Sequence, residues 1–342
     1  MKILFALPGH LKTVPMGQFC VEALNELGHM VISFDFKSSL RDKLLDRWAR
    51  LTQSGQREAK NSTNQRLRNL VEHTRPDLFI ALFGFDISEQ SLTYLKQKHI
   101  PSACWWINDP FQFQRSLKQA PHYDFVFSNS AGSVAQYQAA GIRHANFLPT
   151  ACHPAVHRPV PAKAEYQCDV CFAGDWSPVR EQVLTELAPQ FDVKIFGPWK
   201  KKLTANSILQ RNLNDGFFTP EQMTQMFCSA KVVLNIHTWY GAYDHGVNPR
   251  LFEAAGCGTF QVVDWKQEIP SLFDCQTEVK CYRTPDEIAP LIAQALASAE
   301  MRQTVATAAQ HRAYSEHTYR HRMQQLIEYM QQQSGETPRL DV

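Results

Sequence analysis

Short apolar runs alternate with longer amphipathic stretches through the first part of the chain. Residues 3–7 are an apolar run of strand length, the helical pattern after them ends at Gly28, and a second apolar run covers residues 30–34. Strand, helix and strand within about thirty residues predict a parallel βαβ unit. The polar segment 38–73 is predicted to be helical, with a break near Ser54. Further strands are expected at residues 77–83, 103–107, 124–128 and 146–148.

A proline-rich segment separates this pattern from a second one like it. Residues 151–163 contain several prolines and little periodicity, which favours a linker between two α/β domains, residues 1–150 and 164–315. In the second domain, strands are expected at residues 170–173, 193–196, 231–236 and 259–263. Residues 316–333 have an apolar stripe along one helix face, so this last helix should pack on another surface. Residues 334–342 are predicted to form a flexible tail.

The composition is that of an ordinary globular protein, and it argues against nucleic-acid-binding and membrane-spanning proteins. Of 342 residues, 44% are hydrophobic and 20% are charged, and the net charge is +2. We therefore expect no nucleic-acid partner, because such binding normally needs a basic field. No apolar run approaches the ~20 residues of a transmembrane segment. Nine scattered cysteines without an export signal predict reduced thiols and a cytoplasmic protein.

Four predicted helix starts in the second domain combine a capping residue with proline at the first helical position. Two of them also have Gln or Glu at the third position and so predict capping boxes, beginning at Thr219 and Thr284. The other two begin at Ser177 and Asn248 and place an arginine in the first turn. A cation there opposes the helix dipole and costs on the order of 0.3–1 kcal/mol.

Arg180 and Arg250 are these two arginines, and each has two interpretations. On the surface, Arg180 could pair with Glu181 or Glu186, and Arg250 with Glu253. Alternatively, both could bind a diphosphate together with the N–H groups of the helix N-termini. Both helices with an arginine in the first turn occur in the same domain, and each follows a strand. We therefore favour the anion-binding interpretation.

Glu253 lies one turn into the helix that Asn248 begins. A carboxylate at the edge of a parallel sheet can accept hydrogen bonds from both hydroxyls of a ribose. The alternative role is the ion pair with Arg250.

The residues around this helix resemble the donor-site signature of GT-B glycosyltransferases, and most closely the branch called CgeB-like or spore-maturation-protein-like. The similar segments are residues 234–237, 248–259 and Asp264, the linker sequence 148–154 and the ending 317–322. The resemblance covers most of residues 120–330. It implies an α/β GT-B fold, in which two Rossmann-like domains face each other across a cleft and the C-terminal helix packs back on the N-terminal domain.

The resemblance also implies which residues bind the nucleotide-sugar donor. Gly174 and Arg180 would lie beside the diphosphate, and Glu253 would hold the ribose. The remaining donor-binding candidates are Asn235, His237, His245, Gly246, Asn248 and Arg250. In retaining members a first glutamate precedes the second by seven intervening residues, and this position is His245 here. Retention and inversion therefore both stay open.

The N-terminal domain would bind the acceptor, which the sequence does not identify. His10 follows the first strand and Asp109 follows the strand at 103–107, so either could be the catalytic base, and Asp109 could instead orient one. The alternative is that each is a loop cap or a solvated polar residue. The resemblance implies transfer without a metal or other cofactor, and Cys168 and Cys171, although spaced like zinc ligands, have no second pair.

Three functions fit these patterns. The first is sugar transfer from a nucleotide-diphosphate donor to the acceptor. The second is epimerisation of the nucleotide sugar itself. The third, suggested by His245 in place of glutamate, is a non-catalytic protein that binds nucleotide sugars. The chain lacks the motifs of dinucleotide dehydrogenases, P-loop NTPases and α/β-hydrolases.

Overall fold

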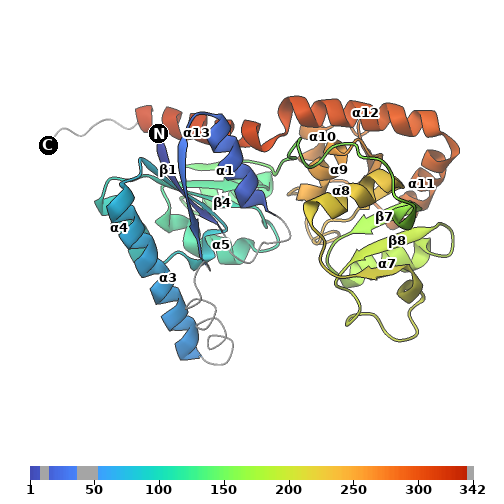
Figure 1. Cartoon of the computed structure of the whole chain (residues 1–342), viewed down its shortest axis with the longest axis horizontal. Coiled ribbons are helices and arrows are strands. Elements are labelled where there is room, and N and C mark those ends of the chain that lie inside the picture. The colour runs from blue at the N-terminus through green and yellow to red at the C-terminus, as the bar shows by residue number, and fades with distance from the viewer. Residues whose placement is uncertain (8–14, 37–52, 337–342) are drawn as a thin grey trace. The chain divides into compact units, whose positions relative to one another are not determined.

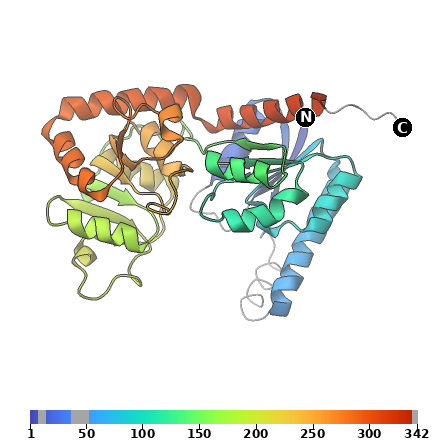
Figure 2. The ribbon, with the colours of Figure 1, turned by 180° about the vertical axis from the view of Figure 1, so that it is seen from behind.

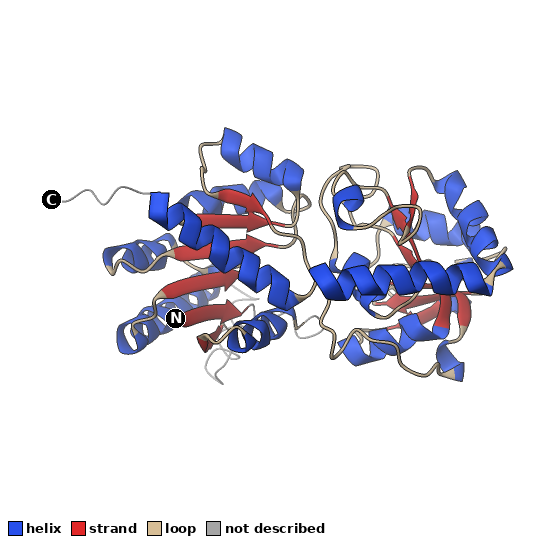
Figure 3. Ribbon diagram, turned by 90° about the horizontal axis from the view of Figure 1, so that it is seen from above, coloured by secondary structure: helices blue, strands red, loops and turns tan. Residues whose placement is uncertain are grey.

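A computed structural model describes residues 1–7, 15–36 and 53–336, and it divides the chain into two compact units (Figure 1). Unit 1 consists of Met1–Pro149 together with Arg320–Val342, and unit 2 consists of Thr150–Tyr319. Residues 151–163, expected to be a linker, group with unit 2. In both units helices lie along the two faces of a sheet (Figures 2 and 3), so the α/β class is confirmed.

Unit 1 contains a parallel sheet of six strands in the order β2-β1-β3-β4-β5-β6. In the register of this sheet, Ile3 pairs with both Val31 and Leu78. All six strands were expected from the apolar runs, and their bounds are β1 Lys2–Leu7, β2 Met30–Asp35, β3 Leu78–Leu82, β4 Ser102–Trp106, β5 Phe125–Ser128 and β6 Ala145–Phe147.

The helices of unit 1 place apolar side chains on this sheet, and the core they form includes Leu4, Phe79 and Trp106. The predicted helix 38–73 is observed from Gln53, and residues 37–52 lie outside the described part of the chain. The helices are α1 Met16–Glu26, α3 Gln53–Thr74, η1 Gly84–Asp86, α4 Glu89–Gln97, α5 Phe113–Gln119, η2 Ala120–His122, α6 Ala131–Ala139 and α13 Tyr319–Glu336.

Helix α13 packs on the N-terminal domain, as its apolar stripe required. The Tyr329 ring lies against Phe125 and Phe127 of β5, with centroids 6.4 and 5.6 Å away. Arg322, which is buried, donates from Nε to the Pro149 carbonyl at 2.9 Å. This part of the predicted architecture is confirmed.

Unit 2 contains a second parallel sheet of six strands, in the order β12-β11-β10-β7-β8-β9. The strands are β7 Cys168–Ala173, β8 Val193–Gly197, β9 Leu213–Asp215, β10 Ala230–Asn235, β11 Gln261–Asp264 and β12 Lys280–Tyr282. The helices are η3 Ala164–Tyr166, α7 Pro178–Leu187, η4 Ile208–Asn212, α8 Pro220–Ser229, α9 Pro249–Gly256, α10 Ile269–Leu272, η5 Pro285–Glu287, α11 Ile288–Ala297 and α12 Ala299–Glu316.

The strand order of unit 2 reverses between β7 and β10, which pair directly. At such a switch point the loops after the two strands leave toward opposite faces of the sheet, and ligands of open α/β sheets bind there. Helix α7 follows β7 and helix α9 follows β10. The two helix starts that carry arginines therefore belong to the two strands at the switch point.

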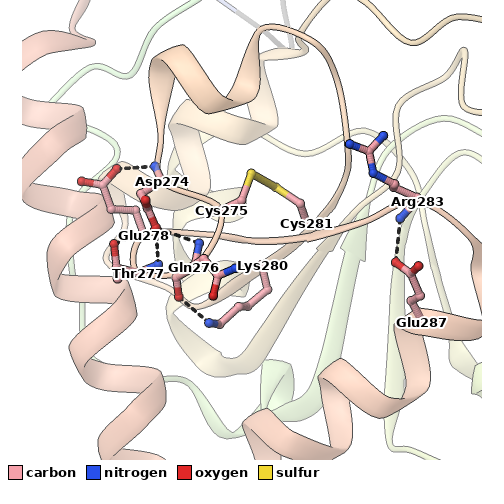
Figure 4. Close-up of a disulfide and its surroundings, with 9 residues drawn as sticks. All are labelled: Asp274, Cys275, Gln276, Thr277, Glu278, Lys280, Cys281, Arg283 and Glu287. Atoms are coloured by element: carbon pink, nitrogen blue, oxygen red, sulfur yellow. Dashed lines mark hydrogen bonds between the residues drawn. A yellow bond between two sulfur atoms is a disulfide. The ribbon is translucent and has the colours of Figure 1, made fainter.

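Three of the four predicted helix starts are confirmed. Ser177 accepts from the Arg180 amide, Asn248 accepts from the Leu251 amide, and Thr219 forms a complete capping box with Gln222. The capping box at Thr284 is wrong. The segment after Thr284 is the short 3-10 helix η5, and the Glu287 carboxylate accepts from the Arg283 amide, one residue before the expected cap (Figure 4).

Cys275, in the turn before β12, forms a disulfide with Cys281 of β12 (Figure 4), so the expectation of reduced thiols is wrong for this pair. Asp274 organises the turn by accepting from the amides of Gln276 and Thr277 at 2.8 and 2.7 Å. The turn brings the two cysteine Cα atoms to 5.5 Å, a separation that a disulfide spans.

We predict that Tyr329→Ala lowers the free energy of unfolding by about 1–2 kcal/mol, because the half-buried ring loses its contact with β5. Tyr329→Phe keeps the ring and should leave stability unchanged. Urea unfolding of the three proteins measures this. Equal stability of the alanine variant would show that α13 does not contribute to unit 1 through this ring.

Candidate functional site

The segment from the end of β10 into α9 carries most of the predicted donor-binding residues. Asn235 is the last residue of β10, Asn248 is the N-cap of α9, and Arg250 and Glu253 lie in the first turns of α9. Gly174 directly follows β7, and Arg180 lies in the first turn of α7. The structure thus brings the predicted residues to one edge of the unit 2 sheet.

Two buried amides join the end of β10 to the start of α9. Asn235 Nδ2 donates to Asn248 Oδ1 at 3.0 Å, and Asn248 Nδ2 donates back to Asn235 Oδ1 at 2.7 Å. Asn235 Nδ2 also donates to Gln261 Oε1 at 3.0 Å. Because Asn248 Oδ1 accepts from the Leu251 amide as well, the helix start is fixed to the strand end.

His237 continues this arrangement. Its ring Nδ1 lies 2.7 Å from Asp264 Oδ1, and its ring Nε2 accepts from the Asn248 amide at 3.0 Å. Since a main-chain amide can only donate, Nε2 carries no proton and the proton is on Nδ1. Burial lowers the pKa of His237, which agrees with a neutral ring.

Asp264 has a second partner that the sequence analysis missed. Lys266 Nζ lies 2.9 Å from Asp264 Oδ2, and both side chains are at most 1% exposed. Burial opposes the ionisation of Asp264, but its hydrogen bonds with His237 and the nearby charge of Lys266 together lower its pKa. A lysine directly after a buried strand was the signal available in the sequence.

The connection from β10 to α9 is held to the residues after β11 through its main chain. Lys266 Nζ donates to the Tyr243 carbonyl at 2.7 Å, the Gln267 amide donates to the Asp244 carbonyl at 2.8 Å, and Glu268 Oε1 accepts from the Gly246 amide at 2.9 Å. Gly246 has a φ of +85°, which favours glycine.

His245 lies in this connection, half-buried, with its ring 5.6 Å from the Tyr243 ring. Burial lowers its pKa. Its neighbours on both sides are held through main-chain atoms.

Arg180 is only 6% exposed, and the surface pairing with glutamate is not observed. Its guanidinium donates to the Ile236 carbonyl from Nε at 3.0 Å and from Nη2 at 2.5 Å, and to the Asp175 carbonyl from Nη1 at 2.8 Å. A Cβ on Gly174 would lie 3.5 Å from Arg180 Nη1, so the guanidinium lies against this glycine. Burial lowers the pKa of Arg180 to about 10.

Arg250 makes the reciprocal contact. Its Nε donates to the Ala173 carbonyl, the last of β7, at 3.1 Å. Its Nη1 pairs with Glu253, so the alternative ion pair is present. Arg180 therefore reaches from the β7 side to the end of β10, and Arg250 reaches from α9 to the end of β7. We call these two contacts the arginine crossing.

Comparisons with known proteins agree with this geometry. Residues 180–328 match a family described as glycosyl transferase-like. The chain is 25% identical over 207 residues to the spore protein CgeB of Bacillus subtilis, and this match covers 57% of the chain and 65% of CgeB, slightly under two thirds of that protein. Residues 180–328 are thus similar to glycosyl transferases, and the chain is similar to CgeB.

Solved structures extend the likeness to the whole chain. Sucrose-phosphate synthase from Thermosynechococcus elongatus has a TM-score of 0.71 at 12% identity, covering 98% of this chain and all of that one. Anabaena HepE in complex with UDP-glucose has a TM-score of 0.67 at 14% identity, covering 97% of this chain and 100% of that one. With its two parallel sheets, this CgeB-like chain has the GT-B fold. The expected cleft between its domains stays a prediction.

Of the two candidate bases, the structure describes only Asp109. His10 lies outside the described residues. Asp109 is 1% exposed, and its oxygens accept from the hydroxyls of Ser116, Ser128 and Tyr137, each at 2.8 Å. Its carboxylate therefore lies inside unit 1, and a catalytic role for Asp109 stays a prediction. Among the described residues, no helix combines the length and apolar character needed to cross a bilayer.

We predict that Asp109 makes the stability of the CgeB-like chain depend on pH. Burial raises the pKa of this carboxyl to about 6, against about 3.9 in an unfolded chain. Its stabilising contribution is therefore complete below pH ~4 and is lost as the pH rises through ~6. Compared with Asp109→Asn, the wild type should lose about 2 kcal/mol between pH 4 and pH 7.

Urea unfolding of both proteins at a series of pH values measures this difference. A difference that does not change with pH would mean that Asp109 ionises in the folded chain as it does in the unfolded one.

Proposed function

We propose that the chain transfers a sugar from a nucleoside-diphosphate donor to an acceptor that is not yet identified. The arginine crossing carries the proposal, because it gathers Arg180, Arg250 and the starts of α7 and α9 at the switch point of the unit 2 sheet. Each helix start adds partial positive charge. Such a concentration of positive groups suits a diphosphate.

The same groups would assist the reaction as well as binding. When the bond between sugar and phosphate breaks, negative charge grows on the departing nucleoside diphosphate. Donors already in place at that charge lower the barrier, because they interact more strongly with the transition state than with the ground state. Arg250, whose side chain is 20% exposed, is the arginine that would contact the diphosphate directly.

Glu253 would accept hydrogen bonds from the ribose hydroxyls. Its Oε2 is engaged with Arg250, so Oε1 is the oxygen for the ribose. The solved complex of HepE contains UDP-glucose, which makes UDP and UDP-sugars the first ligands to test. His10 and Asp109, although the latter is buried, stay the candidates for the base, and Gly174, His245 and Gly246 would line the donor.

Two alternatives belong to the same fold. A nucleotide-sugar epimerase would convert the donor sugar in the absence of any acceptor, whereas a transferase would not. A non-catalytic binding protein would bind the donor without turnover. Product analysis with a UDP-sugar alone, and then with candidate acceptors, distinguishes the three.

We predict that UDP or a UDP-sugar stabilises the chain and that Arg250→Ala and Glu253→Ala abolish this effect. At one hundred times its Kd, a ligand adds about 2.7 kcal/mol to the free energy of unfolding. A thermal-shift series with nucleoside diphosphates and UDP-sugars measures it. Arg211→Ala and Glu221→Ala remove exposed residues of the same types in unit 2 and should leave the shift intact.

Shifts that persist in both site variants would contradict the proposed donor site. The absence of a shift with every nucleotide would contradict the proposed donor class.

We also propose that transfer needs no metal, because the arginine crossing and the two helix starts provide positive charge for the leaving group. Within the described residues, no three His, Cys, Asp or Glu side chains come together as metal ligands would. Excess EDTA should therefore leave UDP binding and turnover unchanged. Loss of turnover in EDTA that Mg²⁺ or Mn²⁺ restores would overturn this part of the proposal.

A further inference from the structure

Asp264, the last residue of β11, and Lys266 after it place buried charge next to His237 before the start of α9. Asp264 accepts from the main-chain amide of His237 at 2.8 Å and from its ring at 2.7 Å. Lys266 pairs with the other oxygen of Asp264 and also donates to the Tyr243 carbonyl. Isolated buried charges are costly, so the charges in this group must balance.

His237 is the group whose state depends on that balance. The charged residues that act on it are Asp264, Lys266 and, from α7, Arg180. Arg180 already donates to two main-chain carbonyls. Lys266 is therefore the cation in direct contact with the Asp264 carboxylate.

The main-chain amide of Asn248 requires His237 to be neutral. It donates to His237 Nε2 at 3.0 Å, which is possible only while that nitrogen is unprotonated. If His237 became an imidazolium, two N–H groups would face each other across this distance. The N-cap of α9 would then have to move, and with it the amides at the start of the helix.

We infer that Lys266 is a positioning residue of the donor site: its buried ammonium group balances Asp264, so that His237 stays neutral and holds the Asn248 amide at the start of α9. The inference rests on the proposed function only in assigning α9 to the diphosphate. We assign Lys266 no direct contact with the donor, because its ammonium group is already bound to Asp264 and to the Tyr243 carbonyl.

A purely structural role for Lys266 makes different predictions. If the lysine only tethers the Tyr243 carbonyl, its removal would loosen the connection before α9 without changing the protonation of His237. If it balances charge, its removal would transfer the positive charge to His237, because that ring is the remaining group in contact with Asp264 that can take up a proton.

The test is Lys266→Met, with Lys231→Met as the matched control. Lys231 also pairs with an aspartate, Asp169, at 2.8 Å, but its side chain is 55% exposed and lies at the opposite end of β10. The protonation of His237 is followed by ¹H–¹⁵N correlation spectra of histidine-labelled protein, assigned with His237→Gln. UDP affinity is measured by calorimetry on the same samples.

In the wild type and the control, His237 should be neutral with its proton on Nδ1 at pH 7. In Lys266→Met it should be doubly protonated at pH 7, and UDP should bind about tenfold more weakly. Raising the pH to about 9 should return both the spectrum and the affinity toward wild type. The double variant Asp264→Asn with Lys266→Met removes both charges and should restore a neutral ring at pH 7.

A neutral His237 in folded Lys266→Met would overturn the inference, whether or not UDP affinity falls. If that variant fails to fold, the double variant and the wild type still decide: a protonated ring in either would overturn it. If no nucleotide binds to the wild type, the proposed function fails, while the spectra still test the charge balance.

Discussion

The arginine crossing is the interaction on which the proposed donor site depends. Adjacent parallel strands at a switch point send their chains to opposite faces of the sheet. The carbonyls of Ala173, at the end of β7, and Ile236, directly after β10, lie at this edge. Arg250 and Arg180 donate to these carbonyls, each from the side of the other strand. Buried carbonyls need donors, and a guanidinium provides several in fixed directions. The two arginine contacts thus provide donors to carbonyls at the sheet edge and place two positive charges there.

The start of α9 is placed by a second set of contacts, which are mostly uncharged. Asn235 and Asn248 bind each other through their amides, and His237 binds the Asn248 main chain. Every one of these groups is buried and has a fixed partner, so the helix start has little freedom to rearrange when a ligand arrives. Such preorganisation lowers the entropy lost on binding and keeps the donors in place as charge develops.

Most strands and helix starts were predictable from the sequence, because they depend on the residues of one short segment. The buried strands that were expected appear as apolar runs, whereas β9 and β12 are three-residue strands without a readable period. The helix caps at Ser177 and Asn248 were predictable because each is a capping residue followed by proline. Thr284 is also a capping residue followed by proline, but it begins only a short 3-10 helix. The burial of Asp109, the disulfide of Cys275 and the buried ion pair of Lys266 depend on partners distant in space or on turn geometry, which periodicity does not encode.

The loop before α9 is held mainly by main-chain contacts, which do not involve the side chain at position 245. Its contacts with the residues after β11 use the carbonyls of Tyr243 and Asp244 and the amide of Gly246. Because these are main-chain atoms, the loop path does not depend on the side chain at position 245. Histidine can therefore stand there while Asn248, Arg250 and Glu253 keep their positions. Under the proposed function, the residue at position 245 would contact the sugar, whereas Arg250 and Glu253 would bind the nucleotide.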